Sequence, residues 1–183
     1  MKTGKDLFID GGEIYLRLPN RSDIKGNWYK WLNDSEVTKY QNKGIFANSR
    51  EKQRQYLRQA LESRNDVIFA IIHKKMETHI GSIGLHKIDW VHRSAEIGIV
   101  IGEKKFWGKG YGRIAWNLMV DYGLNVLNLH RIYAVIFEDN IPSIKAAKSS
   151  GFKYEGKMRD MFYKKGEYHS ALMFSVLEKE FNK

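Results

Sequence analysis

Several features that are common in other proteins are missing from this 183-residue chain. It has no cysteine, which excludes disulfides, catalytic thiolates and cysteine-ligated zinc. No apolar run reaches the roughly 18 residues that a membrane span needs, and the segment Met1–Asp6 lacks the apolar core of a secretory signal peptide. Repeats and low-complexity linkers are also missing. We therefore expect one cytoplasmic domain over residues 1–183, with its core at about 13–180 and no membrane association.

The charge of the chain is strongly one-sided. The formal net charge is +10 and the pI is near 9.6, so the protein attracts anions such as nucleic acid, a polyphosphate cofactor or a nucleotide-linked substrate. Its lysines and arginines are spread along the sequence, and no helix-turn-helix, zinc-finger or RNA-binding motif accompanies them. We do not expect nucleic acid to be the partner.

Hydrophobic periodicity and turn residues predict a mixed α/β domain. We expect a central, mostly antiparallel, twisted sheet of six to seven strands with about four helices. The predicted strands span 13–18, 67–73, 79–88, 94–101, 131–137, 152–163 and 168–177. The predicted helices span about 22–31, which Ser22 and Asp23 would cap, 48–63, which Asn48 would cap, 112–126 and 140–151.

A glycine-rich loop is the most informative motif. The glycines Gly108, Gly110 and Gly112 follow an apolar strand and open a predicted helix. Glycines let a ligand approach the backbone, and the free N–H groups of a helix N-terminus attract phosphate. The spacing fits neither a dinucleotide fingerprint nor a nucleoside-triphosphate loop. A phosphate-binding loop is therefore predicted, and glycines that only allow close helix packing are the alternative.

Four motifs then resemble, in order, the GNAT superfamily of acetyl-CoA-dependent N-acetyltransferases over nearly the whole chain. They are the Ala-Glu-Ile-Gly strand at 95–98, the glycine loop at 107–112, the Asn-x-x-Ser helix at 140–143 that runs to Gly151-Phe152, and the final hairpin at 166–169. Trp107 stands where the family usually has Gln or Arg. A Trp at this position is similar to the branch that includes the ribosomal-protein N-terminal acetyltransferases.

The resemblance implies a GNAT-like single domain that binds acetyl-CoA as acetyl donor and needs no metal. The loop amides would bind the pyrophosphate, the strand backbone would pair with the pantetheine arm, and an amide there would stabilise the oxyanion. Asn140 would bond the arm near the sulfur, and an N-cap role is compatible with this. The implied cofactor-binding residues are Ile99, Val100, Ile101, Trp107, Gly108, Lys109, Gly110, Tyr111, Gly112, Arg113, Asn140 and Ser143.

Acetyl transfer requires a neutral amine, so a group must accept a proton. Glu96 is the predicted base, because burial among apolar neighbours would raise the pKa of its carboxylate; a structural ion pair with Arg93 or another cation is the alternative. Many family members supply an acid from a Tyr seven positions after the helix Asn, where this chain has Ala147. Ser143 and Tyr154 are the candidate proton donors, and release of the thiolate without an acid is the third option.

The molecule that receives the acetyl group is the least determined part of the predicted function. The segment at 31–40 is similar to the one that edges the acceptor pocket in the branch named above, and the candidate substrate residues are Trp31, Asn33, Tyr40, His86 and Trp90. We expect a small molecule: an amino sugar on a nucleotide carrier, a polyamine or an antibiotic. The basic charge argues against a polycation unless the pocket is locally acidic. The alternatives are a peptide N-terminus, as in a ribosomal protein, and a non-catalytic CoA-binding or nucleic-acid-associated module. Whether the chain forms a homodimer is left open.

Overall fold

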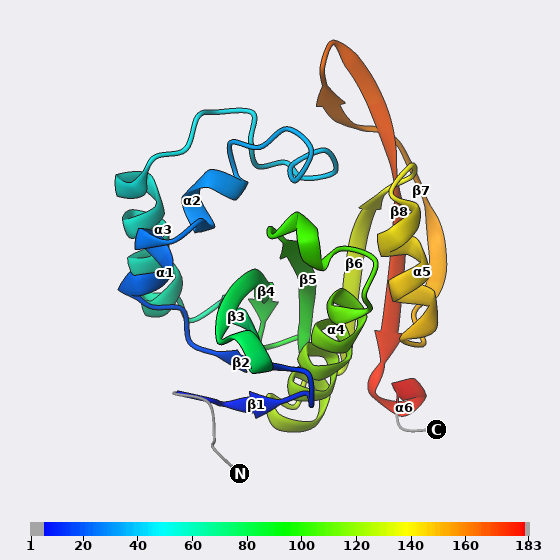
Figure 1. The fold of residues 1–183 in the computed structure, drawn as a ribbon. Coiled ribbons are helices and arrows are strands. Elements are labelled where there is room, and N and C mark those ends of the chain that lie inside the picture. Colours follow the sequence, from blue (N-terminus) through cyan, green and yellow to red (C-terminus); the bar gives the residue numbers. More distant parts are fainter. Residues whose placement is uncertain (1–5, 182–183) are drawn as a thin grey trace.

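The computed structural model describes residues 6–181, so most of the segment inspected for a signal peptide lies outside it. Eight strands form one sheet in the order β1-β2-β3-β4-β5-β6-β8-β7 (Figure 1). Their bounds are β1 Ile9–Asp10, β2 Ile14–Arg17, β3 Val67–His73, β4 Thr78–Asp89, β5 Ser94–Ile101, β6 Arg131–Phe137, β7 Lys153–Lys164 and β8 Glu167–Leu177. The helices are α1 Arg21–Lys25, α2 Trp28–Trp31, α3 Arg50–Glu62, α4 Tyr111–Asp121, α5 Ile141–Ser149 and α6 Glu178–Phe181.

The mixed α/β fold with a mostly antiparallel sheet is confirmed. All seven predicted strands are present, and β1 is an eighth strand of two residues, too short to show any periodicity. Three short helical segments complete the chain: η1 Lys74–Met76, η2 Lys104–Phe106 and the π-helical η3 Tyr122–Val126. No helix within residues 6–181 is long and apolar enough to cross a membrane.

The predicted N-caps of the first two helices were wrong. The helix predicted at 22–31 is divided at Gly26 into α1 and α2, and its cap is Asn20, whose side chain accepts from the Ser22 amide. The cap of α3 is Ser49 rather than Asn48, because Ser49 has the extended backbone from which a hydroxyl reaches the first turn. In both cases a neighbouring polar residue competes for the same role, and sequence alone does not rank the two.

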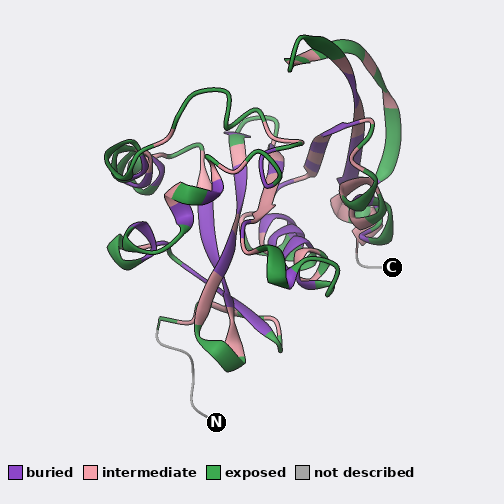
Figure 2. Ribbon diagram, turned by 45° about the horizontal axis from the view of Figure 1, so that its top comes forward, coloured by how far each residue is buried: buried purple, intermediate pink, exposed green. Residues whose placement is uncertain are grey.

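Helices cover both faces of the sheet. Helices α1, α2 and α3 pack on one face around Trp28 and Ile68, and α4 packs on the other around Trp116 and Met119. In β5 the side chains alternate, so Ile99 and Ile101 pack with the α4 side while Val100 packs with the α1–α3 side. Figure 2 shows the buried strands between these layers, with exposed residues in the loop that precedes α3.

The strands β5 and β6 form the feature that positions the site. They are the only parallel neighbours in the described sheet, and they pair at just three positions, from Ser94↔Arg131 to Glu96↔Tyr133. Beyond Glu96 the two strands diverge, while β5 continues to pair with β4 up to Ile101. The second half of β5 therefore has an unpaired edge in the middle of the sheet.

Candidate active site

A cavity of about 240 Å³ lies where β5 and β6 separate. Residues 96–100 of β5 and 134–137 of β6 line opposite walls, and the start of α5, the middle of α4 and the loop segment 40–43 complete it. A strand edge opening into a cavity can pair with an extended ligand in the way that another strand would.

The open edge of β5 has two carbonyl groups that side chains occupy. Gln41 Nε2 donates to the Ile99 carbonyl at 3.1 Å, and Trp107 Nε1 donates to the Ile101 carbonyl at 2.7 Å. Because the N–H and C=O of one strand residue point the same way, the amides of Ile99 and Ile101 also face the gap. The Val100 carbonyl points toward β4, because a Cβ added to Gly81 of β4 would lie only 2.3 Å from its oxygen.

The glycine loop has the geometry of an anion site. Gly108 and Gly110 have φ values of +73° and +84°, and a Cβ on either would meet no atom within 4 Å. Among the residues that the structure describes, the amides of 108–113 donate no hydrogen bond within the chain. Gly112 lies in the first turn of α4 against Ile101. Free amides at a helix N-terminus beside an open space fit a pyrophosphate.

Not every predicted loop residue offers its side chain to this space. The Tyr111 side chain is buried, and its hydroxyl lies 3.2 Å from His73 Nε2, so only its backbone faces the loop. Lys109 has its ammonium 5.6 Å from the centre of the Phe106 ring, and Arg113 is exposed. The two cations add positive charge next to the free amides.

Asn140 and Ser143 both line the cavity at the start of α5. The Asn140 side chain accepts from the Ser143 amide at 3.3 Å, so it caps this helix. Trp116 of α4 also lines the cavity; it is 3% exposed, and its Nε1 has no hydrogen-bond partner in the described part of the chain. A buried donor without a partner is costly unless a ligand completes it. The unpaired Trp116 Nε1, the open edge of β5 and the free amides of residues 108–113 together fit a pantetheine arm and its pyrophosphate.

Glu96 lies in the opposite half of the cavity, at the last position where β5 pairs with β6. Its carboxylate pairs with Lys87 Nζ at 2.8 Å, and its side chain is 24% exposed. The hydrogen bond with Glu96 raises the pKa of Lys87. The ion pair that was the alternative to a catalytic role is therefore present, with Lys87 as partner; Arg93 pairs instead with Glu178.

His86 is the direct cross-strand neighbour of Glu96. Its Nδ1 lies 3.0 Å from Asp66 Oδ1, and Ser63 Oγ donates to the other Asp66 oxygen at 2.8 Å. Burial opposes ionisation of Asp66, but the hydrogen bonds with Ser63 and His86 outweigh it and lower the pKa of Asp66. His86 Nε2 is left beside the two facing glycines Gly84 and Gly98. This chain of polar groups was not predicted, because Asp66 gives no signal in the sequence.

The remaining candidate substrate residues are in different environments. Tyr40 lines the cavity next to Phe137, which stacks on Phe162 at 4.2 Å. The structure does not bring the others to this cavity. Trp31 is buried with its Nε1 bonded to Glu103, Asn33 bonds to the loop before α3, and Trp90 is exposed near the end of β4. The candidate proton donor Tyr154 also lies outside the cavity, exposed on β7.

A second cavity of about 450 Å³ adjoins the first, and Tyr56 and His86 line both. Two carboxylates, Glu62 and Asp66, contribute to its wall, and of the described residues no lysine or arginine does. Although the protein as a whole is basic, this part of the site is locally acidic.

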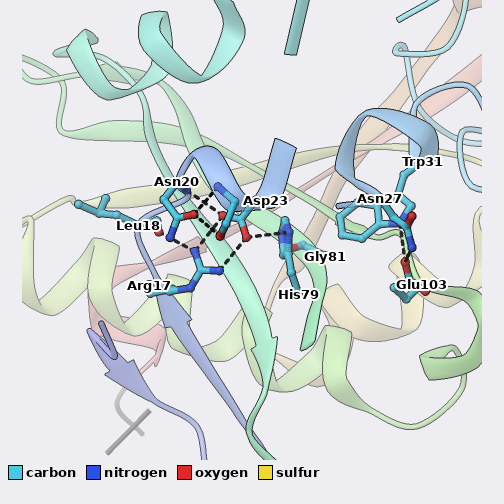
Figure 3. A network of polar contacts seen from close by, with 10 residues as sticks. Arg17, Leu18, Asn20, Asp23, Asn27, Trp31, His79, Gly81 and Glu103 are labelled. Atoms are coloured by element: carbon cyan, nitrogen blue, oxygen red, sulfur yellow. Dashed lines mark hydrogen bonds and ion pairs between the residues drawn. The ribbon is translucent and has the colours of Figure 1, made fainter. Parts of the chain in front are cut away.

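A polar network fixes α1 and α2 to the rest of the domain (Figure 3). Arg17 of β2 makes two hydrogen bonds to Asp23 of α1, and His79 of β4 lies 3.3 Å from the same carboxylate. His79 Nε2 is 2.8 Å from the Gly81 carbonyl. Nearby, Glu103 accepts from Asn27 and from Trp31 of α2. The helices on the acceptor side are therefore anchored both to the sheet and to the segment that leads into the glycine loop.

The comparisons with known proteins agree with this geometry. The family model described as "Acetyltransferase (GNAT) domain" matches residues 13–153, and the chain belongs to this family. It is 36% identical to the uncharacterized N-acetyltransferase p20 of Bacillus licheniformis over 83% of this chain and 86% of the relative. It is 33% identical to the spermidine N(1)-acetyltransferase of Escherichia coli (strain K12), over 55% of this chain and 54% of the relative.

The same fold is found in the Vibrio cholerae spermidine N-acetyltransferase, solved in complex with CoA and spermine. The TM-score is 0.85 with 24% identity, over 93% of this chain and 99% of that one. The protein is therefore an acetyl-CoA-dependent N-acetyltransferase that transfers an acetyl group to an amine. Within residues 6–181 no three histidine, aspartate or glutamate side chains are grouped so that they could hold a metal ion.

Proposed function

We propose that the protein acetylates the primary amine of a small molecule by direct attack on acetyl-CoA within a ternary complex. The observation that carries this proposal is the separation of β5 from β6 just after Glu96. It puts an open strand edge, suited to the donor, and the pair Glu96 and His86, suited to an amine, into one cavity. The chain has no cysteine for a thioester intermediate on the protein.

On the donor side, the amides of residues 108–113 would bind the pyrophosphate and the amides of Ile99 and Ile101 would pair with the pantetheine arm. One of these strand amides would stabilise the charge that develops on the thioester oxygen. Trp116 Nε1 and Asn140 would donate hydrogen bonds to the arm. Gln41 bonds the Ile99 carbonyl, whose second lone pair would accept from an amide of the arm.

On the acceptor side, Glu96 would take the proton from the attacking amine, directly or through water. His86, held by Asp66, is the second group able to accept it from the same face of the sheet. Ser143 is the better placed of the two candidate acids, since it lines the cavity and Tyr154 does not. Its hydroxyl would donate to the departing thiolate.

For the acceptor itself we propose a diamine or polyamine. The adjoining cavity with Glu62 and Asp66 could hold a second ammonium while the first reacts next to Glu96. This local acidity meets the condition under which a basic protein accepts a polycation. The relatives that act on spermidine support the same class.

The test is a panel of amines scored by release of the CoA thiol. It contains spermidine, a monoamine of the same length, a nucleotide-linked amino sugar and a peptide with a free N-terminus. We expect spermidine to have the highest kcat/KM. Equal use of the monoamine would show that the second cavity does not bind an ammonium. Faster turnover of the amino sugar or the peptide would replace the polyamine proposal by that class.

A matched pair of variants tests the acidic cavity. Asp66→Asn removes the charge beside Tyr56, and Asp89→Asn removes a partly exposed carboxylate at the end of β4. We expect the first to raise KM for spermidine about tenfold, in line with the loss of one charged contact, and the second to change it little. Neither should alter the Kd of CoA.

A further inference from the structure

Lys43 lies in the loop before α3 and lines the same cavity as Glu96 and Asn140. Much of the residue is exposed, and its Nζ lies 4.5 Å from the centre of the Tyr56 ring. Burial lowers the pKa of Lys43, which nearby Asp66 only partly offsets. No ion pair of Lys43 with a carboxylate is found in the described chain. The amine therefore lies against Tyr56 at the cavity and is not held by a close counter-ion.

The backbone that carries Lys43 is fixed on both sides of the cavity. Gln41 bonds the Ile99 carbonyl on the open edge of β5. Lys164, at the end of β7, donates to the Gln41 carbonyl at 2.7 Å. Only one residue separates Gln41 from Lys43, so the amine belongs to a segment that touches the strand proposed to bind the donor. A primary alkyl amine is thus already present on the acceptor side of the cavity.

We propose that Lys43 is an internal acceptor, and that the protein acetylates the Lys43 ε-amine when acetyl-CoA is bound and free amine is scarce. This inference rests on the proposed function, because it uses the same donor site. The neutral Nζ attacks the thioester carbonyl carbon, a C–N bond forms and the C–S bond breaks. The sulfur leaves with the bonding electron pair and takes up a proton, while the nitrogen gives its proton to Glu96 or to water. The products are acetyl-Lys43 and free CoA.

Several charged and titratable groups face this amine. The Tyr56 ring of α3 lies against it, and the charge of Asp66 favours its protonated form. Glu96 of β5 and His86 of β4 line the same cavity. Raising the pH increases the neutral fraction of Lys43, so self-acetylation should become faster toward alkaline pH. A free diamine competes for the same acceptor side and should slow it.

The experiment incubates the full chain with acetyl-CoA alone and follows acetylation of each lysine by peptide mass spectrometry. Lys39 is the matched control, since it is on the same segment with its Nζ 4.9 Å from the Tyr40 ring but does not line the cavity. We expect Lys43 to gain acetyl groups at least about tenfold faster than Lys39, because a positioned amine has a high effective concentration. Lys43→Arg should remove this fast phase and Lys39→Arg should leave it.

Equal rates at Lys43 and Lys39 would overturn the inference, because they would indicate solution chemistry at any exposed lysine. The amine panel separates this outcome from failure of the proposed function. A wild type that acetylates a free amine but leaves Lys43 unmodified refutes the internal acceptor alone. Fast acetylation of Lys43 without use of any free amine supports the internal acceptor and refutes the proposed small-molecule acceptor. Absence of both reactions refutes both.

Discussion

The two halves of the cavity are built in different ways. The donor half consists mainly of backbone: the unpaired edge of β5 and the free amides of residues 108–113. The acceptor half consists of side chains from separate segments, with Lys43 from a loop, Tyr56 from α3, Asp66 from the residue before β3 and His86 from β4. A backbone site needs glycines and a strand in a fixed order, whereas a side-chain site depends on the whole fold. The comparison implies that donor and acceptor recognition can be disrupted separately.

The largest expected effect separates chemistry from donor binding. Glu96→Gln keeps the size of the side chain and removes the base, so kcat should fall by about 100- to 10,000-fold. The Kd of CoA, measured by calorimetry, should stay within about twofold, because Glu96 belongs to the acceptor half. His86→Gln is the parallel variant. If His86→Gln costs more in kcat than Glu96→Gln, the base is His86; if Glu96→Gln weakens CoA binding as strongly as turnover, the two halves are not separate.

The same contrast explains what could be predicted from the sequence. Three local patterns predicted the fold and the acetyl-CoA donor: the glycine loop, the Ala-Glu-Ile-Gly strand and the helix that begins after Asn140. Asp66 and Lys43 were missed because neither is unusual in its local sequence, and each becomes relevant only when α3 and its preceding loop pack over β4. Trp31 was assigned to the acceptor from a local motif, yet its packing against Glu103 and Gly102 places it in the core.

The second prediction concerns the network that anchors the acceptor-side helices. Burial lowers the pKa of His79 from its ordinary 6.5 to about 4, with Asp23 partly opposing. Between these values the unfolded chain binds a proton that the folded chain does not, so the free energy of unfolding falls as the pH falls through this window. The loss should reach up to about 3 kcal/mol.

Urea denaturation of the wild type and of His79→Gln, from about pH 7 to about pH 4, measures this loss. The advantage of the wild type over the variant should shrink on acidification. If the advantage grows instead, an imidazolium donates to both Gly81 and Asp23, and the network is strengthened by acid. Donor binding should not follow this pH dependence in folded protein, because the glycine loop has no part in the network.

The third prediction tests whether the donor half depends on backbone. Gly110 and Gly166 have φ values of +84° and +88°, and a Cβ on either meets nothing within 4 Å. Alanine at each should therefore cost a similar roughly 1–2 kcal/mol of stability. Only Gly110→Ala places a methyl group where the pyrophosphate would lie, and it should raise the Kd of CoA at least about tenfold. Equal CoA affinity of the two variants would remove the glycine loop from the donor site.

The smallest expected effect tests a side chain that would donate to the ligand from within the donor half. Trp116→Phe removes a buried N–H that has no partner, which offsets the packing lost with the smaller ring, so the stability of the unliganded protein should change by no more than about 1 kcal/mol. If Nε1 bonds the pantetheine arm, the Kd of CoA should rise about two- to tenfold, the value of one neutral hydrogen bond. Trp31→Phe should show the reverse pattern: it loses the bond to Glu103 and some stability, with CoA affinity unchanged. Unchanged CoA affinity in Trp116→Phe would mean that the donor half binds its ligand through backbone and Asn140 alone, which would make the contrast between the two halves sharper still.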